Sequence, residues 1–147
     1  MTSTNPNLPS IVFLEAGQFY AELANHVEDL SVRHGLIKVS SVFDQMNEKL
    51  AKWQTEQKFT PPLNDLFCKW NNQLHQIRVG NTSTPELSLL EQRLQVESAN
   101  LSKLRKVFQE SKPELEKRYI ADLIATYFNV VDILTKMTRS QKGEYYA

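Results

Sequence analysis

Apolar residues recur every three or four positions through most of this chain, and glycines and prolines interrupt that spacing at only a few points. Residues three and four apart lie on one side of an α-helix, so this spacing predicts helices with one apolar face each. The clearest example lies between residues 87 and 108, where the steps alternate three and four as in a heptad seam. One polar residue, Glu97, interrupts this seam. Its members are Leu87, Leu90, Leu94, Glu97, Leu101, Leu104 and Phe108.

Capping residues, prolines and glycines divide the pattern into five predicted helices. Ser10 can cap the first helix, and Gly35 follows its predicted end, where a left-handed C′ residue belongs. Ser111 and Glu114 have the spacing of a capping box at the start of the last helix. The predicted helices span residues 10–34, 36–57, 61–79, 85–110 and 112–139.

The sequence therefore predicts an all-α protein, a single compact bundle of about five helices. A chain of 147 residues is long enough to bury a core of its own. The short connection near residue 111 predicts that the last two helices form a long antiparallel C-terminal hairpin. We expect a flexible N-terminal tail over residues 1–9, the bundle domain over 10–140 and a C-terminal tail over 141–147.

The charge balance and cysteine content narrow the possible partners and compartments. Seventeen basic residues balance seventeen acidic ones, so no overall charge attracts the chain to nucleic acid or to an anionic membrane. A single cysteine cannot form an intramolecular disulfide, which suits the cytoplasm or another reducing intracellular compartment. No run approaches the roughly 18 apolar residues of a membrane span, and no basic residue precedes the first apolar run as in a secretory signal.

Residues 65–75, DLFCKWNNQLH, contain a thiol, an imidazole and a carboxylate, the groups of a nucleophilic site. Cys68 and His75 share a face of the predicted helix, but two turns separate them by about 10.5 Å. A nucleophile and its base must lie within about 3 Å of each other, so these two residues cannot form such a pair. We interpret Cys68 as a cysteine on the flank of a helix, with a reactive or partner-contacting thiol as the alternative.

Other catalytic and metal-binding patterns also find little support. Glu22 and His26 lie four residues apart on one helix, but no Glu-x-x-His pair and no second cysteine accompany them. Asp122 and Asp132 are expected to form ion pairs with the basic residues four positions away, Arg118 and Lys136. We therefore predict a non-enzymatic protein without a cofactor or metal. An enzyme of unfamiliar design, with His26 or His75 beside carboxylates, is the remaining catalytic alternative.

A basic cluster surrounds the predicted turn between the last two helices and is a candidate nucleic-acid contact. Acidic residues dilute it, and cations near a helix C-terminus also stabilise the helix itself, so we favour a solvated helix end. Its members are Lys103, Arg105, Lys106, Lys112, Lys117 and Arg118.

Protein–protein interaction is the function that remains after these exclusions. We predict an adaptor, a chaperone-like partner or a small subunit of a larger complex, which binds another protein or a second copy of itself through apolar helix faces. A small helical nucleic-acid-binding subunit that uses the basic turn is the alternative. Six candidate partner-binding residues lie on a second apolar line of the fourth helix and on a small-residue flank of the first: Leu89, Val96, Val107, Gly17, Ala21 and Ala24.

Overall fold

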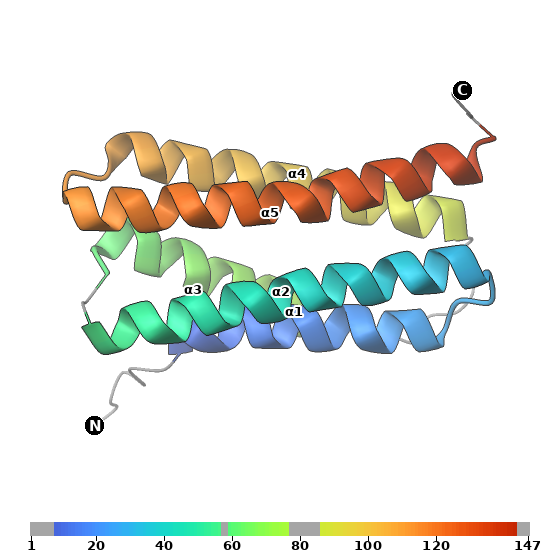
Figure 1. Cartoon of the computed structure of the whole chain (residues 1–147), viewed down its shortest axis with the longest axis horizontal. Coiled ribbons are helices and arrows are strands. Elements are labelled where there is room, and N and C mark those ends of the chain that lie inside the picture. The colour runs from blue at the N-terminus through green and yellow to red at the C-terminus, as the bar shows by residue number, and fades with distance from the viewer. Residues whose placement is uncertain (1–7, 57–58, 77–85, 144–147) are drawn as a thin grey trace.

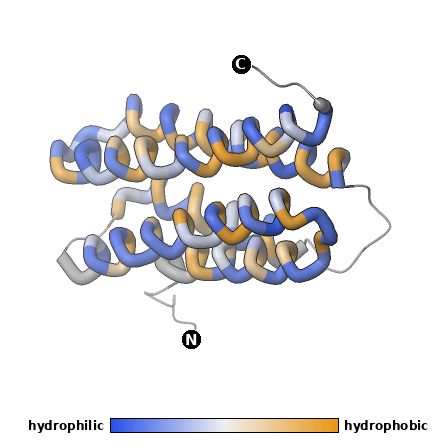
Figure 2. Tube along the Cα trace, turned by 45° about the vertical axis from the view of Figure 1, so that its right-hand side comes forward, coloured by the Kyte–Doolittle hydropathy of each residue, from blue (hydrophilic) through white to orange (hydrophobic). Residues whose placement is uncertain are grey.

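The computed structural model describes residues 8–56, 59–76 and 86–143, and within these residues it contains five α-helices and no strand. The prediction of an all-α bundle of about five helices is confirmed. Each helix carries both hydrophobic and hydrophilic residues along its length (Figure 2). The helices are α1 (Leu8–Asn25), α2 (Leu30–Glu56), α3 (Pro61–Gln76), α4 (Glu86–Glu110) and α5 (Glu114–Gln141).

The five helices form a closed ring, in which each helix packs against two others. Around the ring the order is α1, α2, α5, α4 and α3, and α3 then returns to α1. Figure 1 shows α4 and α5 as one antiparallel pair above α1 and α2, with α3 behind. A ring with an odd number of helices cannot alternate direction throughout, and α1 and α3 are the pair that runs in the same direction.

Large aromatic side chains fill the axis of this ring. Some of their contacts join neighbouring helices, and one joins α3 and α5, which are not neighbours in the ring, through side chains alone. Phe13 of α1 lies 5.4 Å from Phe67 and 6.1 Å from Trp70 of α3, between ring centroids. Phe43 of α2 and Trp70 each contact Tyr127 of α5, at 5.7 and 5.6 Å. These contacts join four of the five helices in one core.

The predicted boundary between the first two helices is wrong. The break falls between Asn25 and Leu30, and Gly35 lies inside α2. Asp29 is the residue that starts α2, because its carboxylate accepts the backbone N–H of Val32 at 3.1 Å. The space at Gly35 is used for packing instead. A Cβ added there would lie 2.1 Å from the sulfur of Met137 on α5.

The predicted capping box at the start of α5 is also wrong. Pro113 occupies the N-cap position and makes no side-chain cap hydrogen bond. Ser111 instead donates to the buried carboxylate of Glu116 at 2.8 Å. The same carboxylate accepts the backbone N–H of Thr60 at 2.8 Å and the Thr60 hydroxyl at 2.6 Å. Glu116 therefore joins the start of α3 to the turn between α4 and α5.

The other boundaries agree with the prediction within two residues wherever the structure describes them. The helices extend into both predicted tails, because residues 8 and 9 belong to α1 and residue 141 belongs to α5. Residues 1–7, 57–58, 77–85 and 144–147 lie outside the described part of the chain. The predicted ends of the second and third helices, at residues 57 and 79, and the predicted start of the fourth, at residue 85, fall on them.

Candidate functional site

The polar member of the α4 seam, Glu97, lies at the centre of the ring and is only 3% exposed. Because the seam residues face the interior, helical spacing also brings Arg93, four residues before, and Asn100, three residues after, to the inner side of α4. Both are buried. Glu97, with two polar neighbours on the same helix, therefore occupies a position where the apolar pattern predicts a residue such as leucine.

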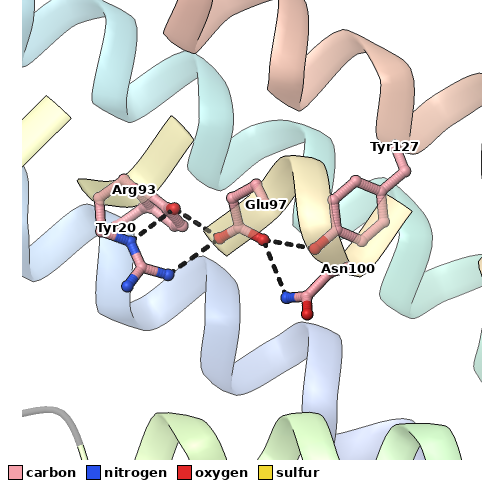
Figure 3. A network of polar contacts seen from close by, with 5 residues as sticks. All are labelled: Tyr20, Arg93, Glu97, Asn100 and Tyr127. Atoms are coloured by element: carbon pink, nitrogen blue, oxygen red, sulfur yellow. Dashed lines mark hydrogen bonds and ion pairs between the residues drawn. The ribbon is translucent and has the colours of Figure 1, made fainter. Parts of the chain in front are cut away.

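Two tyrosines from other helices complete this group, which we call the Glu97 cluster: Tyr20, Arg93, Glu97, Asn100 and Tyr127 (Figure 3). The Tyr20 hydroxyl of α1 donates to one carboxylate oxygen at 2.5 Å, and Arg93 donates to the same oxygen at 3.1 Å. Arg93 Nε also donates to the Tyr20 hydroxyl oxygen at 3.0 Å. The Tyr127 hydroxyl of α5 and the Asn100 amide donate to the second carboxylate oxygen. The cluster therefore links α1, α4 and α5 across the ring.

The Glu97 side chain forms an ion pair with the Arg93 guanidinium and lies against two tyrosine hydroxyls. Burial raises the pKa of both Tyr20 and Tyr127 well above the ordinary tyrosine value, and the neighbouring Glu97 carboxylate raises it further. The tyrosines are therefore neutral donors at physiological pH. The Arg93 guanidinium also lies 4.9 Å from the centroid of the Phe19 ring, which helps to accommodate a buried cation.

The space beside the Glu97 cluster is very small. A cavity of about 20 Å³ lies between the cluster and the side chains of Phe13 and Trp70. That volume holds about one water molecule. The geometry of the cluster therefore fits a structural role, in which one hydrogen-bonded group fixes the register of three helices.

A larger hollow lies on the surface between the first half of α2 and the last turns of α5, with a volume of about 580 Å³. We call it the α2–α5 groove. Among its lining residues, Gly35 of α2 and Ile133 and Met137 of α5 form the floor. Because Gly35 has no side chain, the Met137 side chain occupies the space beside it. The groove is therefore apolar where Gly35 of α2 lies against Met137 of α5.

Polar residues line the walls of the α2–α5 groove, and exposed apolar residues lie at and beyond its edge. At 100° per residue, Gly35, Lys38 and His34 lie about 140°, 80° and 40° from Leu30 on α2. All four line the groove, and Leu30 lies at its outer edge with 74% of its surface exposed. Ile37, 51% exposed, shares the direction of Leu30 to within about 20°.

On α5, Met137 and Ile133 point inward, and Asp132 and Lys136 form an ion pair at 3.1 Å on the wall. This pair was predicted and is confirmed. Phe128, 50% exposed, lies about 40° beyond Asp132, on the outer side. The second predicted pair is wrong, because Asp122 pairs with Lys49 of α2 at 3.0 Å and not with Arg118.

The structure places most of the predicted partner-binding residues against the protein's own core. On α4, Val107 is 9% exposed, and Leu89 and Val96 are half-buried, with Val96 lining the small cavity. On α1, Gly17 and Ala24 are buried, and Ala21 is exposed.

The small-residue flank of α1 is used for close packing inside the bundle. A Cβ on Gly17 would lie 3.3 Å from the backbone oxygen of Ser40 on α2. The Ser40 hydroxyl donates to the backbone oxygen of Gly17 at 2.7 Å. The absence of a side chain at Gly17 therefore allows α1 to approach α2 closely.

The basic cluster lies at the end of the molecule where α4 turns into α5 (Figure 1). Five of its six side chains are exposed: Lys103, Arg105, Lys106, Lys112 and Arg118. The sixth, Lys117, is half-buried, and its amine lies 5.6 Å from the centroid of the Phe108 ring.

The remaining candidates from the sequence are not brought together. Cys68 is half-buried on α3, His26 is exposed just after α1, and the side chain of His75 lies outside the described residues. Among the described residues, no group of three or more His, Cys, Asp and Glu side chains could hold a metal ion. Across the same residues, no helix is both long and apolar enough to cross a membrane.

Comparison with protein-family models, with curated proteins and with solved structures finds no match to this chain.

Sequence reasoning identified Glu97 as an anomaly but did not identify its partners. Tyr20 and Tyr127 have the spacing of core residues, and nothing in the pattern indicates that their hydroxyls converge on one carboxylate. Arg93 and Asn100 give the available signal, because they lie four and three residues from a polar seam position. The α2–α5 groove was missed because Gly35 was interpreted as the end of a helix.

Proposed function

We propose that this protein is a protein–protein interaction module that binds a helix of its partner in the α2–α5 groove. Such a module acts as an adaptor, a chaperone-like partner or a small subunit of a larger complex. The proposal moves the docking surface from α4 and α1 to α2 and α5, because the candidate residues on α4 and α1 are largely covered within the chain.

The observation that carries the proposal is the exposure of Leu30 at the edge of a groove with an apolar floor. A single exposed apolar side chain on a protein surface needs no explanation. One that lies at the edge of a concave surface with an apolar floor is typical of an interaction site. Grooves between two helices commonly bind the apolar face of a third helix.

Site-specific photocrosslinking in cells that express the protein natively tests this proposal. A photoreactive residue at position 30, at the edge of the groove, is expected to crosslink to one discrete protein, and the same residue at Ser102, an exposed position on α4, is not. A Leu30→Asp variant should then lose that protein in co-purification, and a Ser102→Asp variant should retain it. Equal crosslinking at both positions, or retention by Leu30→Asp, would contradict the proposal.

Binding of nucleic acid is the second candidate, supported by the five exposed cations at the α4–α5 end. Phosphate contacts release counterions, so any such binding should weaken steeply with salt. A gel shift with single-stranded and duplex probes, lost when Lys106 and Lys112 are replaced by glutamate, would favour this candidate over the interaction module. No shift at low salt would remove it.

A further inference from the structure

The charged residues of the α2–α5 groove leave a net positive charge on its α2 wall. On the α5 wall, Asp132 is neutralised by Lys136 at 3.1 Å. On the α2 wall, Lys38 is exposed and makes no ion pair with any of the described residues. His34 lies one turn before Lys38 and adds a second nitrogen donor. An occupant of the groove therefore meets an unbalanced cation on one side only.

The shape of the groove suits an elongated occupant. It lies between two long antiparallel helices and opens to solvent along them. Small molecules are usually bound in enclosed pockets that bury most of their surface, which an open groove does not provide. Met137 at the floor is unbranched and flexible, so it can adjust to the side chains of an incoming helix.

We propose that the α2–α5 groove binds an amphipathic helix of another protein, one that carries carboxylates beside its apolar stripe. This inference rests on the proposed function and specifies the partner. The apolar stripe would cover Ile133, Met137 and the exposed Leu30, and a carboxylate would lie against Lys38. Charge complementarity of this kind sets the orientation and the choice of partner more than the affinity.

Two other occupants fit the groove less well. A second copy bound by twofold symmetry would present the same surface, whose one lining carboxylate, Asp132, is already paired with Lys136 and so offers Lys38 no free counter-ion. An anionic membrane gains only about 1 kcal/mol for each nearby lysine, so the few cations of this groove would hold a membrane weakly.

Two matched peptides test the inference on the full chain. Both are amphipathic helices of about 18 residues, or five turns, with leucine stripes flanked by glutamate in one and by lysine in the other. Titrations at low salt follow the binding by fluorescence anisotropy. The ¹³C-methyl NMR signals of Ile133 and Met137 report contact with the groove itself. The variants are Lys38→Glu and, as a control, Lys103→Glu on the exposed face of α4.

We expect the glutamate peptide to shift both methyl signals and to bind about tenfold more tightly than the lysine peptide, because opposite charges meet at Lys38. Lys38→Glu should reverse this preference, and Lys103→Glu should leave it unchanged. Equal binding of the two peptides at the groove would overturn the charge assignment and leave the proposed function standing. If neither peptide shifts the methyl signals, both proposals fail. Concentration-dependent dimerisation through Met137 would assign the groove to a second copy and overturn the inference.

Discussion

Glu97 occupies the position of an apolar residue in the α4 seam, so its carboxylate must find hydrogen-bond donors inside the ring. Tyr20, Arg93, Asn100 and Tyr127 supply them from three helices. Burying an ion pair gains little net free energy of folding over apolar packing, but removing one partner leaves an uncompensated charge. We therefore expect the intact ion pair to contribute more to specifying one arrangement of the helices than to the free energy of unfolding.

Replacing Glu97 with glutamine should lower the free energy of unfolding by about 3–5 kcal/mol, because the buried Arg93 cation loses its counter-ion. Urea denaturation followed by circular dichroism measures this loss. Glu91→Gln is the matched control, since Glu91 is a half-exposed residue of the same helix that pairs with Lys142 at 3.2 Å. Such a surface pair contributes less than about 1 kcal/mol. Similar losses for the two variants would contradict a central role for Glu97.

The buried tyrosines predict a loss of stability at high pH. Burial raises the pKa of Tyr20, Tyr127 and Tyr119 above the unfolded value of about 10, with Glu97 adding to the first two and Asp122 to the third. Above pH 10 the unfolded chain loses protons that the folded chain keeps. The free energy of unfolding should therefore fall by up to about 1.4 kcal/mol per pH unit for each tyrosine.

Absorbance at 295 nm checks this prediction, because it follows tyrosinate formation directly. Tyr20, Tyr119 and Tyr127 should ionise together with the loss of helical circular dichroism, in one transition. Ionisation of all three with a pKa near 10 in the folded protein would show that their hydroxyls are accessible to solvent. A Glu97→Gln variant should shift this transition to lower pH, because the folded state is less stable and the carboxylate that raises the pKa of Tyr20 and Tyr127 is absent.

At the scale of helices, the pattern in the sequence predicted all five helices but misplaced the break between the first two. Glycine and aspartate both give boundary signals in the region of residues 26–35, and the two signals disagree. Asp29 caps α2 and Gly35 lies within it, because the free energy gained by packing Met137 against Gly35 offsets the poor helix propensity of glycine. A tertiary contact of this kind leaves no periodic signal, so the groove that it forms could not be predicted either.

The contact between Gly35 and Met137 predicts that the effect of one substitution depends on the other. Gly35→Ala should destabilise the protein by about 1–3 kcal/mol, because the new methyl group overlaps the Met137 side chain. In a Met137→Ala background the same substitution should stabilise it by about 1 kcal/mol, the gain of alanine over glycine inside a helix. A double-mutant cycle from urea denaturation measures the coupling. Additive effects would mean that α2 and α5 do not approach closely at this point.

At the scale of the molecule, a closed ring allows no helix to leave without exposing the core of its neighbours. The helix that tests this most directly is α3, because Trp70 on it contacts Phe13 of the neighbouring α1 and, across the ring, Tyr127 of α5. The Glu116 carboxylate also holds the residue before α3 to the start of α5. One contiguous cluster of buried residues draws on all five helices. The ring should therefore unfold as one cooperative unit.

A Trp53→Phe variant makes this expectation measurable, since it leaves Trp70 as the only tryptophan of the chain. Trp53 is half-buried against Tyr119, so phenylalanine keeps the apolar contact at a modest cost in stability. Trp70 fluorescence and far-ultraviolet circular dichroism should then give the same midpoint in urea, because the environment of α3 is lost only when the whole ring opens. If Trp70 changes at a lower urea concentration than the helical signal, α3 detaches before the other four helices. The ring would then be a four-helix core with a separable fifth helix.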